Sequence, residues 1–562
     1  MSEALALESL EVGAQPLIEP LLQRLRLREF LLQALAPTDP RMQLPAVDSA
    51  LVLVRNFTLC RYPLYEVAQW VRGFVPSELG LAPEQVELMN DDRLGRTLDK
   101  LFEADRRSVI TRLIVHMTRE FQLDLQRVHN DSTSITFSGV YSEPAPRKDG
   151  RRCVRITHGH NKDHRPDLKQ LVWSLSVTSD GAVPVHYNLF DGNVTDDQTH
   201  IETWKALREV VGGSGFLYVA DAKLCTRENM AYLHERGGRF ITVLPRTRKE
   251  DARFKRRLLD QAPAWQLVWE RAPLRRSTDP PERFEALEDP ELSAEGYRIV
   301  WYRSSEKWRR DERTRDNAIH EARWALHRLG ERVGRGKLKT REQVQQAVDQ
   351  ILDHTETRSW LSVQLLPRER HTYKQGGPGR PGRHTRYVRH TTTVYEPAVT
   401  LDTERIQASA VADGIFPLIT NSPAEQLSAL DLLTTYKYQA FLEKRHEQLK
   451  TAAEVMPVNY KTPERIEAFL FLYFIAITLH ALLEREVREA MNTRGLRSIP
   501  IYPEERACRA PTADKLLGLF DGVRRHRLFS NGQPIQMFWD TLTDVQRIVL
   551  DLLGIPTAAY GQ

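Results

Sequence analysis

The chain has 562 residues, of which 41% are hydrophobic and 28% charged, a balance that excludes a largely disordered protein. At about 150 residues per domain, this length allows roughly three to four domains. The net charge of +5 is unevenly placed, because residues 367–390 hold seven basic residues and one glutamate while the rest is close to neutral. This basic arm is typical of a segment that binds a polyanion, although a solvated basic loop would have the same composition.

Cysteines and apolar runs indicate a reducing compartment and no membrane. The four cysteines lie far apart with no CxxC pair, which argues against a disulfide framework or a zinc ribbon. The N-terminal residues lack a basic region followed by an apolar one, so no secretory signal is expected. The longest apolar run, residues 469–483, has 15 residues and falls short of a membrane span. We therefore expect a cytoplasmic protein in which this run is a buried core helix.

Residues 1–127 are predicted to form an all-helical N-terminal domain. Apolar residues recur at helical spacing over residues 17–35, 47–54 and 64–74, and residues 93–123 form a long amphipathic stretch. Such a block is either a domain that binds DNA ends or a plain helical scaffold.

A sheet is predicted for the next part of the chain, residues 128–245. Stretches enriched in β-branched and aromatic residues are assigned as strands, at residues 128–137, 171–177, 182–189, 216–220 and 240–244. The second and third strands are joined by the hairpin signal Ser179-Asp180-Gly181, and a helix over residues 226–236 separates the last two. A hairpin followed by a strand–helix–strand unit predicts a mixed α/β sheet with helices on its faces.

Residues 246–396 interrupt this pattern and are predicted to be an inserted α+β subdomain. Strand-like residues 297–302 and 359–366 flank a charged helical region at residues 305–352. The Gly- and Pro-rich residues 376–383 are expected to form an extended flexible loop within the basic arm.

Residues 397–500 are predicted to complete the sheet domain. A strand at residues 415–420 precedes a helix over residues 423–452. A second helix begins at Thr462-Pro463, an N-cap followed by proline at the first helical position. The remaining residues, 501–562, are expected to form a helical C-terminal region.

Two aspartates stand out against the strand pattern. Asp131 lies in a polar patch within the first strand, where a carboxylate is disfavoured unless a cation pairs with it. Asp221 directly follows the apolar strand 216–220, at the edge where a sheet opens into a crevice. Each also has a simpler interpretation, since Asp131 suits a turn or a sheet edge and Asp221 suits the N-cap region of the next helix. The residues alone leave both interpretations open.

A third carboxylate belongs to a polar stripe on the helix over residues 423–452. Tyr436, Gln439, Glu443 and Lys450 fall at offsets that share one helix face. A tyrosine, an amide, a carboxylate and an ammonium along one stripe suit a DNA backbone beside a metal site. The same spacing would also arise on a solvated face.

The order of these and other motifs resembles the bacterial insertion-sequence DDE transposases, whose catalytic glutamate lies in a Tyr-x2-Arg-x3-Glu-x6-Lys helix. Three of the four signature positions match, and Gln439 stands at the arginine position, where it brings neither charge nor a bidentate fork. Further matching motifs lie at residues 90–99, 159–170, 191–197, 219–223 and 413–421. The resemblance covers residues 10–500. It implies a ribonuclease H-like catalytic core with Asp131 on its first strand, Asp221 after its fourth, and an insertion before the helix of Glu443.

The resemblance also implies the chemistry. Asp131, Asp221 and Glu443 would be the catalytic residues and would hold two Mg²⁺ ions, for which Mn²⁺ would substitute, with Asp131 bridging both ions. Such a site can serve DNA strand cleavage and then strand transfer by the freed 3′-OH. Three neighbours on the glutamate helix would position the end phosphates: Tyr436, Gln439 and Lys450.

Polar clusters elsewhere supply further candidates. Residues 158–167 combine three histidines and two aspartates with Lys162 and Arg165, which suits a DNA-facing loop better than a metal site. Asp196 and Asp197 lie in a polar loop near the sheet edge, either as surroundings of the active site or as simple caps.

The insertion adds two kinds of candidate. Arg380-Pro-Gly-Arg383 resembles a minor-groove Arg-Pro hook, or is a disordered linker that binds phosphate without selectivity, and in both cases Arg380 and Arg383 would contact DNA. Trp301 or Trp308 could stack on a flipped base, although tryptophan is more often part of a core.

We therefore predict a DNA transposase that acts on double-stranded DNA as a homodimer, pairing the terminal inverted repeats of an insertion sequence in a synaptic complex. It is expected in the bacterial cytoplasm, associated with the nucleoid. Two alternatives stay open: a metal-dependent endonuclease of the same fold that cuts without joining, and a DNA-binding transposase derivative that no longer cleaves. The presence of all three acids argues against the second alternative.

Overall fold

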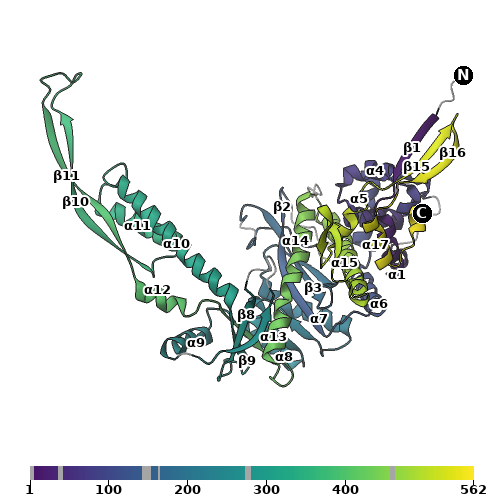
Figure 1. The fold of residues 1–562 in the computed structure, drawn as a ribbon, viewed down its shortest axis with the longest axis horizontal. Coiled ribbons are helices and arrows are strands. Elements are labelled where there is room, and N and C mark those ends of the chain that lie inside the picture. Colours follow the sequence, from purple (N-terminus) through teal and green to yellow (C-terminus); the bar gives the residue numbers. More distant parts are fainter. Residues whose placement is uncertain are drawn as a thin grey trace. The chain divides into compact units, whose positions relative to one another are not determined.

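The computed structural model describes residues 5–35, 42–141, 153–162, 165–261, 263–272, 280–455 and 462–562, and Figure 1 labels many of their helices and strands. The chain forms two compact units. The first unit comprises Met1–Thr242, Thr420–Ser422 and Asp431–Gln562, and the second unit comprises Val243–Ile419 and Pro423–Leu430. The inserted subdomain expected at residues 246–396 lies within the second unit.

A mixed sheet is the centre of the first unit. Its strands are β2 (Arg127–Phe137), β3 (Lys169–Thr178), β4 (Pro184–Phe190), β5 (Leu217–Val219) and β6 (Arg239–Val243). β2 pairs antiparallel with β3 and parallel with β5, while β3 pairs antiparallel with β4 and β5 parallel with β6. The resulting order is β4-β3-β2-β5-β6, with β2 in the middle. This topology confirms the predicted ribonuclease H-like sheet.

Helices connect the strands at the parallel end of this sheet. α7 (His200–Val211) precedes β5, and α8 (Arg227–Glu235) joins β5 to β6. α8 is the helix expected over residues 226–236. It begins where predicted because the Thr226 hydroxyl accepts a hydrogen bond from the backbone N–H of Asn229 at 3.2 Å, an N-cap contact.

The N-terminal part is mainly helical, as predicted. Its α-helices are α1 (Gln15–Arg24), α2 (Leu27–Ala34), α3 (Ala46–Leu59), α4 (Leu64–Gly73), α5 (Asp91–Glu103) and α6 (Arg106–Glu120). One strand, β1 (Leu5–Glu11), precedes them and pairs antiparallel with β15 (Arg524–Ser530). The expectation of an all-helical domain is therefore corrected at its first residues.

The predicted core helix is α15 (Pro463–Thr493). By length and composition it could cross a membrane, yet its most apolar stretch is entirely buried inside the protein. The Phe469 ring lies 4.8 Å from the Phe57 ring of α3, and His480 Nε2 lies 2.6 Å from the Thr58 carbonyl. α15 is thus packed within the first unit, as the sequence predicted.

The helix expected over residues 423–452 is two helices. α13 (Ala429–Lys437) ends one residue before Tyr438, and α14 (Gln439–Val455) begins one residue after it. Around Tyr438 the backbone bonds span three residues, from Tyr438 N to Thr435 O and from Phe441 N to Tyr438 O. The Tyr438 hydroxyl also accepts from Gly181 N at 2.9 Å, which ties this break to the turn between β3 and β4.

The C-terminal residues are not only helical, which corrects the prediction for residues 501–562. They form β13 (Ile499–Tyr502), β14 (Arg506–Cys508), α16 (Ala513–Gly518), β15, β16 (Gln533–Trp539) and α17 (Asp544–Leu552). The β15–β16 turn is Asn531-Gly532, with φ of 49° and 81°. Asn-Gly with two positive φ angles is the preferred hairpin turn, so the sequence carried this signal.

The second unit combines a meander with a helical pair. β7 (Gln266–Arg271), β8 (Glu282–Glu288) and β9 (Arg298–Ser304) pair antiparallel in sequence order. The other elements are α9 (Lys249–Asp260), α10 (Ser305–Arg332), α11 (Arg341–His354), α12 (Thr403–Ala410) and β12 (Ile415–Thr420), together with a hairpin of β10 (Leu361–Gln375) and β11 (Tyr387–Leu401). Apolar residues from α10, α11 and the hairpin base make one core, including Leu326, Val348, Leu361 and Val394.

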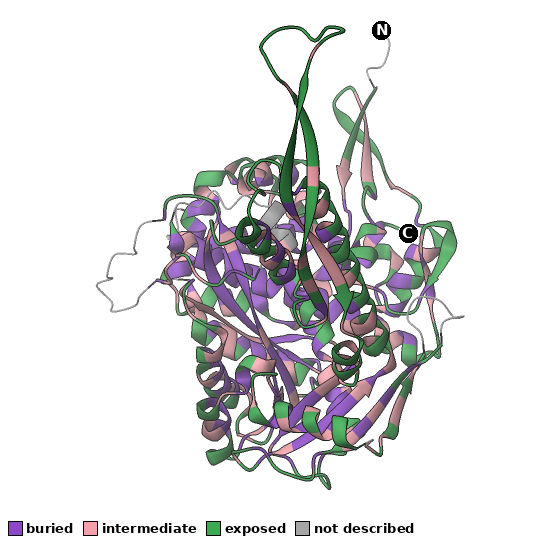
Figure 2. Cartoon of the chain, turned by 90° about the vertical axis from the view of Figure 1, so that its left-hand side faces the viewer, coloured by how far each residue is buried: buried purple, intermediate pink, exposed green. Residues whose placement is uncertain are grey.

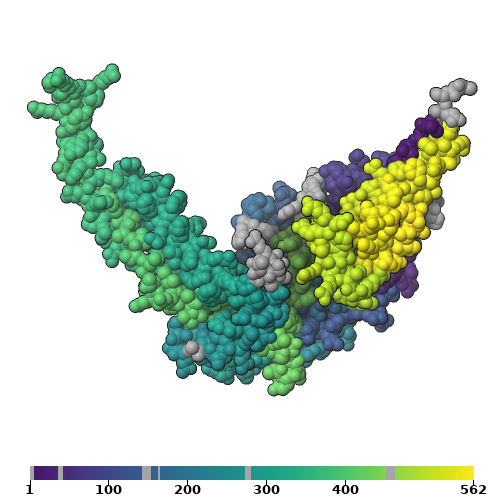
Figure 3. All heavy atoms as spheres, viewed as in Figure 1, coloured from purple at the N-terminus to yellow at the C-terminus, as the bar shows by residue number. Residues whose placement is uncertain are grey.

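The basic arm is a β-hairpin rather than a loop alone. β10 and β11 pair from Leu361 opposite Leu401 to Gln375 opposite Tyr387, so the strand predicted at residues 359–366 continues to Gln375. Residues 376–383 lie in the connecting loop, neither helix nor strand, as expected. The outer half of the hairpin is almost wholly exposed (Figure 2), and Figure 3 shows side chains standing out from its tip.

Candidate active site

Strand register brings Asp131 and Asp221 to neighbouring positions. His129 of β2 lies opposite Val219 of β5 in the parallel pair. Asp131 comes two residues after His129, and Asp221 comes two residues after Val219. Parallel neighbours present their carboxyl ends at one edge of the sheet. The simpler interpretation of Asp221 also holds, because its Oδ1 accepts from Lys223 N at 3.0 Å and caps a short 3₁₀ turn.

α14 adds Glu443 to this edge, and its first residue sets its position. Gln439 Oε1 lies 3.1 Å from His129 Nδ1, and Gln439 Nε2 donates to the Asn130 carbonyl at 2.9 Å. Both polar ends of this buried side chain are therefore bonded to the two residues that precede Asp131. Gln439 does not face outward as expected of a phosphate contact; it fastens α14 to β2.

The three acids share one electrostatic environment. Burial, with the nearby charge of Asp131, raises the pKa of Asp221 to about 6. Burial also raises the pKa of Asp131 against the opposing charge of Lys162, and it raises the pKa of Glu443 together with the charge of Asp131. The charge of Asp131 thus disfavours the ionisation of both other acids, and a nearby cation would favour it.

Tyr436 lies beside all three carboxylates. Burial raises the pKa of its phenol, and the charges of Asp221, Glu443 and Asp131 raise it further. The hydroxyl therefore stays protonated at neutral pH and can donate a hydrogen bond to an anionic ligand. Because α13 ends before Gln439, Tyr436 reaches the site from a different helix than Glu443 does.

Two residues around Asp131 were not predicted as site residues. Asp196, which the sequence placed either near the active site or in a cap, holds Lys162 Nζ at 3.0 Å and accepts from Ser132 Oγ at 2.6 Å. His446 Nε2 lies 3.7 Å from Asp131 Oδ2, and burial lowers the pKa of this histidine to about 3. His446 follows Glu443 by three residues, so helical spacing could have identified it.

The oxygen-rich donor set fits a hard divalent ion. Mg²⁺ and Mn²⁺ take carboxylate oxygens and keep bound water, and Asp131, Asp221 and Glu443 come from three different elements. Within the part of the chain that the structure describes, no three acidic, histidine or cysteine side chains already lie close enough to hold an ion together.

The other predicted DNA contacts are placed as follows. Lys162 Nζ lies 3.8 Å from Asp131 Oδ1, and the charge of Lys450 also lowers the pKa of this carboxyl group. Arg165 is exposed and pairs with Asp167 at 2.7 Å. Asp163 and His164, two further members of that predicted loop, lie outside the described residues.

The candidate DNA contacts of the second unit differ in how far they are exposed. Arg380 and Arg383 are exposed at the hairpin tip. Trp301 is buried, stacked 3.7 Å from the Phe254 ring, and its indole donates to Asp289 at 2.8 Å, so it is a core residue and does not receive a base. Trp308 is 42% exposed.

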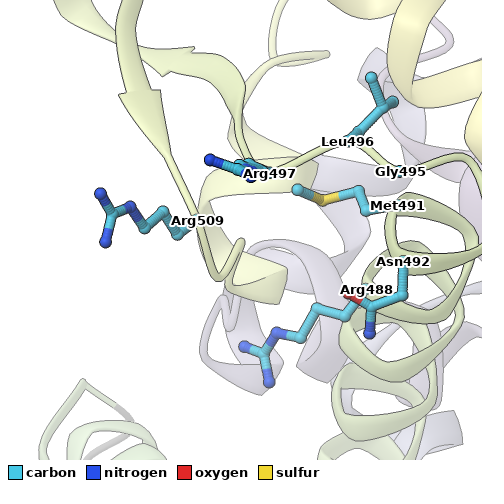
Figure 4. Close-up of a pocket in the computed structure, with 7 residues that line it drawn as sticks. All are labelled: Arg488, Met491, Asn492, Gly495, Leu496, Arg497 and Arg509. Atoms are coloured by element: carbon cyan, nitrogen blue, oxygen red, sulfur yellow. The ribbon is translucent and has the colours of Figure 1, made fainter. Parts of the chain in front are cut away.

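A separate hollow in the first unit lies where α15 ends. Its volume is about 440 Å³, and it is lined by Arg488, Met491, Asn492, Gly495, Leu496, Arg497 and Arg509. Figure 4 shows the three arginine side chains extending to the same side of this hollow. Arg488 donates to the Pro511 carbonyl, which leaves Arg497 and Arg509 as the more open guanidinium groups.

Comparisons with known proteins cover most of the chain. A family model described as "Transposase DDE domain" matches residues 126–479, and one described as "Domain of unknown function (DUF4277)" matches residues 7–115. No curated protein matches the chain.

Solved structures with some similarity are complexes of two transposases. A piggyBac transposase synaptic complex with hairpin DNA is 11% identical, with a TM-score of 0.27, over 84% of this chain and 83% of that chain. A Mos1 transposase paired-end complex with left transposon end is 10% identical, with a TM-score of 0.13, over 35% of this chain and 58% of that chain. A Mos1 mariner paired-end complex with Mn is 12% identical, with a TM-score of 0.14, over 40% and 65%.

Proposed function

Because the chain belongs to the family of DDE transposases, we propose that it binds the terminal inverted repeats of an insertion sequence and catalyses DNA cleavage and strand transfer with Asp131, Asp221 and Glu443. The observation that carries this proposal is the parallel register of β2 and β5, which sets the two aspartates side by side. α14 adds the glutamate, and the charge of Asp131 raises the pKa of both Asp221 and Glu443.

Divalent metal use follows from the family, and Mg²⁺, with Mn²⁺ as substitute, is the ion we propose. Two such ions would activate water and stabilise the leaving 3′-oxygen. Asp131 is suited to the central position because it is fixed within β2, where Ser132 N donates to its Oδ1 at 2.8 Å. Asp221 is fixed from both sides, since Lys223 N donates to its carboxylate and Thr242 Oγ1 to its carbonyl.

Basic and phenolic groups around the acids would hold the DNA end. Tyr436 can donate to a phosphate oxygen, and Lys162 and Lys450 supply positive charge beside the scissile bond. Gln439 is no longer proposed as a phosphate contact, because its side chain is hydrogen-bonded to β2. These groups orient the phosphate, while proton transfer is left to water held by the carboxylates.

Contacts farther from the acids would bind the rest of the DNA. Arg165 lies on an exposed loop, and Arg380 and Arg383 lie at the tip of the basic arm. Guanidinium groups on a β-hairpin can follow a phosphate backbone or enter a minor groove. We further propose that residues 1–127 bind the DNA ends, and that a homodimer pairs two ends in the cytoplasm, near the nucleoid.

The test uses purified protein with labelled end DNA, a target plasmid and Mg²⁺. We expect nicked ends and joined products from the native protein, and neither from Asp131→Ala, Asp221→Ala or Glu443→Ala. Asp197→Ala is a matched control, since Asp197 lies beside Asp196 but contacts Asn229 through its backbone oxygen. Cleavage without joining would identify an endonuclease, and binding without cleavage a derivative that has lost catalysis.

A further inference from the structure

Lys162 is held by Asp131, one of the three acids that we assign to the metal site, and by the neighbouring Asp196. Its ammonium lies 3.0 Å from Asp196 Oδ2 and 3.8 Å from Asp131 Oδ1. It also donates to the Ser132 carbonyl. The charges of Asp131, Asp196 and Asp221 all act on this ammonium, which is itself largely surrounded by protein.

This position conflicts with direct loading of a metal ion. A divalent ion held by Asp131 Oδ1 needs the carboxylate oxygen that now faces the ammonium. Two cations within about 4 Å repel each other strongly where water is scarce. His446 and Lys450, which also act on Asp131, supply no negative charge that would offset the repulsion between the ammonium and a divalent ion. His446 is neutral, because burial lowers its pKa to about 3, and Lys450 adds positive charge.

The Lys162 side chain is free to move its ammonium away from Asp131. The Lys162 side chain is 31% exposed, its four-carbon stem is flexible, and it belongs to a loop segment rather than to the sheet. Asp131, by contrast, is fixed within β2. When a second cation arrives, Lys162 is therefore the partner that can move.

We propose that Lys162 is the resident counter-ion of the metal-free active site, and that a divalent ion binds by displacing its ammonium from Asp131 and Asp196 toward the DNA phosphates. This inference rests on the proposed function, because it takes Asp131 to be a metal ligand. It adds a consequence for affinity: Lys162 opposes metal binding when DNA is absent and supports DNA binding when metal is present. By thermodynamic linkage, metal and DNA then strengthen each other's binding.

Calorimetric titration of Mn²⁺ into the DNA-free protein tests the displacement. Removing the competing charge in Lys162→Met is expected to tighten Mn²⁺ binding by at least about five-fold, the lower range of such couplings. Lys162→Arg keeps the charge and should stay close to the native affinity. Lys205→Met, which removes an exposed lysine of α7 beside Tyr232, is the matched control and should change nothing.

Mn²⁺ binding by Lys162→Met that is no tighter than native binding would overturn the inference. If Lys162→Met does not fold by circular dichroism, Lys162→Gln replaces it, and the rise in Tm on adding Mn²⁺ should again exceed the native rise. Asp131→Asn separates the two proposals, because retained native Mn²⁺ affinity in that variant would overturn the metal site itself. Absence of Mn²⁺ binding in both native protein and Lys162→Met would overturn both.

A second measurement follows DNA instead of metal. End-DNA affinity is measured with and without Ca²⁺, a divalent ion with the same preference for oxygen ligands. The native protein is expected to bind DNA several-fold more tightly with the ion, and Lys162→Met should lose most of this gain. An equal gain in both proteins would contradict the release of Lys162 to DNA.

Discussion

Gln439 provides the sharpest contrast between the family pattern and the structure. The family signature has arginine here, which suggests that Gln439→Arg would restore a phosphate contact. In the structure the side chain is 8% exposed, and its two polar atoms bond to His129 and Asn130. Burial lowers the pKa of His129 to about 4, so the neutral ring donates from Nδ1 to the Gln439 oxygen, which can only accept.

Replacing this glutamine should therefore destabilise the protein. Gln439→Leu leaves the His129 donor and the Asn130 carbonyl without their Gln439 partners, at about 1–3 kcal/mol for each buried group, so we expect a loss of about 2–6 kcal/mol. Gln439→Arg should cost at least as much, because a guanidinium cannot accept from His129 and its charge would be buried. Neither variant should bind end DNA more tightly than the native protein.

Scanning calorimetry of Gln439→Leu, Gln439→Arg and the native protein measures the loss in free energy of unfolding. Each kcal/mol lost should lower Tm by roughly 2–4 °C. Gln198→Leu is the control, since Gln198 is exposed. A stability loss below about 1 kcal/mol in Gln439→Leu would contradict the anchoring role. The reasoning would also fail if Gln439→Arg kept its stability, bound ends more tightly and steepened the salt dependence by about one unit.

Two further predictions concern DNA. Tyr436→Phe removes one hydrogen-bond donor beside the three acids and should slow end cleavage by about five- to ten-fold, consistent with about 1 kcal/mol for such a bond, with Mn²⁺ affinity unchanged; a native rate would remove Tyr436 from the site. Arg380→Ala combined with Arg383→Ala should weaken end binding and reduce its salt slope by about two units. An unchanged slope would show that the hairpin tip does not touch phosphate.

The sheet could be predicted because its signals are local. Residues 216–220 are apolar and end at Asp221, and Ser179-Asp180-Gly181 forms the turn after β3. The hairpin and the strand–helix–strand unit together predicted a mixed sheet, while the central position of β2 comes from the structure. Asp131, the weakest candidate by itself, is placed beside Asp221 by the pairing of His129 with Val219, a register that no local pattern contains.

Features that depend on distant contacts were not predictable. The contact of Asp196 with Lys162 joins two separate loops, and the sequence of neither loop indicates that the other lies beside it. The orientation of Gln439 depends on β2, which lies about 310 positions earlier. The helix break at Tyr438 lies where its hydroxyl accepts from Gly181 N, a distant contact, whereas the sequence around Tyr438 predicts a continuous helix.

Two other misses had signals in the sequence. Asn531-Gly532 is a typical turn for the β15–β16 hairpin. The prediction of a helical region over residues 501–562 did not take this turn into account. Thr391–Thr393, Val394 and Tyr395 favour strand, and they continue the hairpin into the basic arm, where charge alone had suggested a loop. In both cases a clear local preference was outweighed by the average composition of its surroundings.

The most direct test of the metal site is the anomalous scattering of a crystal of the protein with end DNA and Mn²⁺. We expect two peaks about 3.5–4 Å apart, with Asp131 between them, Asp221 and Glu443 each on one side, and Lys162 turned from Asp131 to a phosphate. Peaks away from Asp131, or ions held without Asp221 and Glu443, would contradict this expectation.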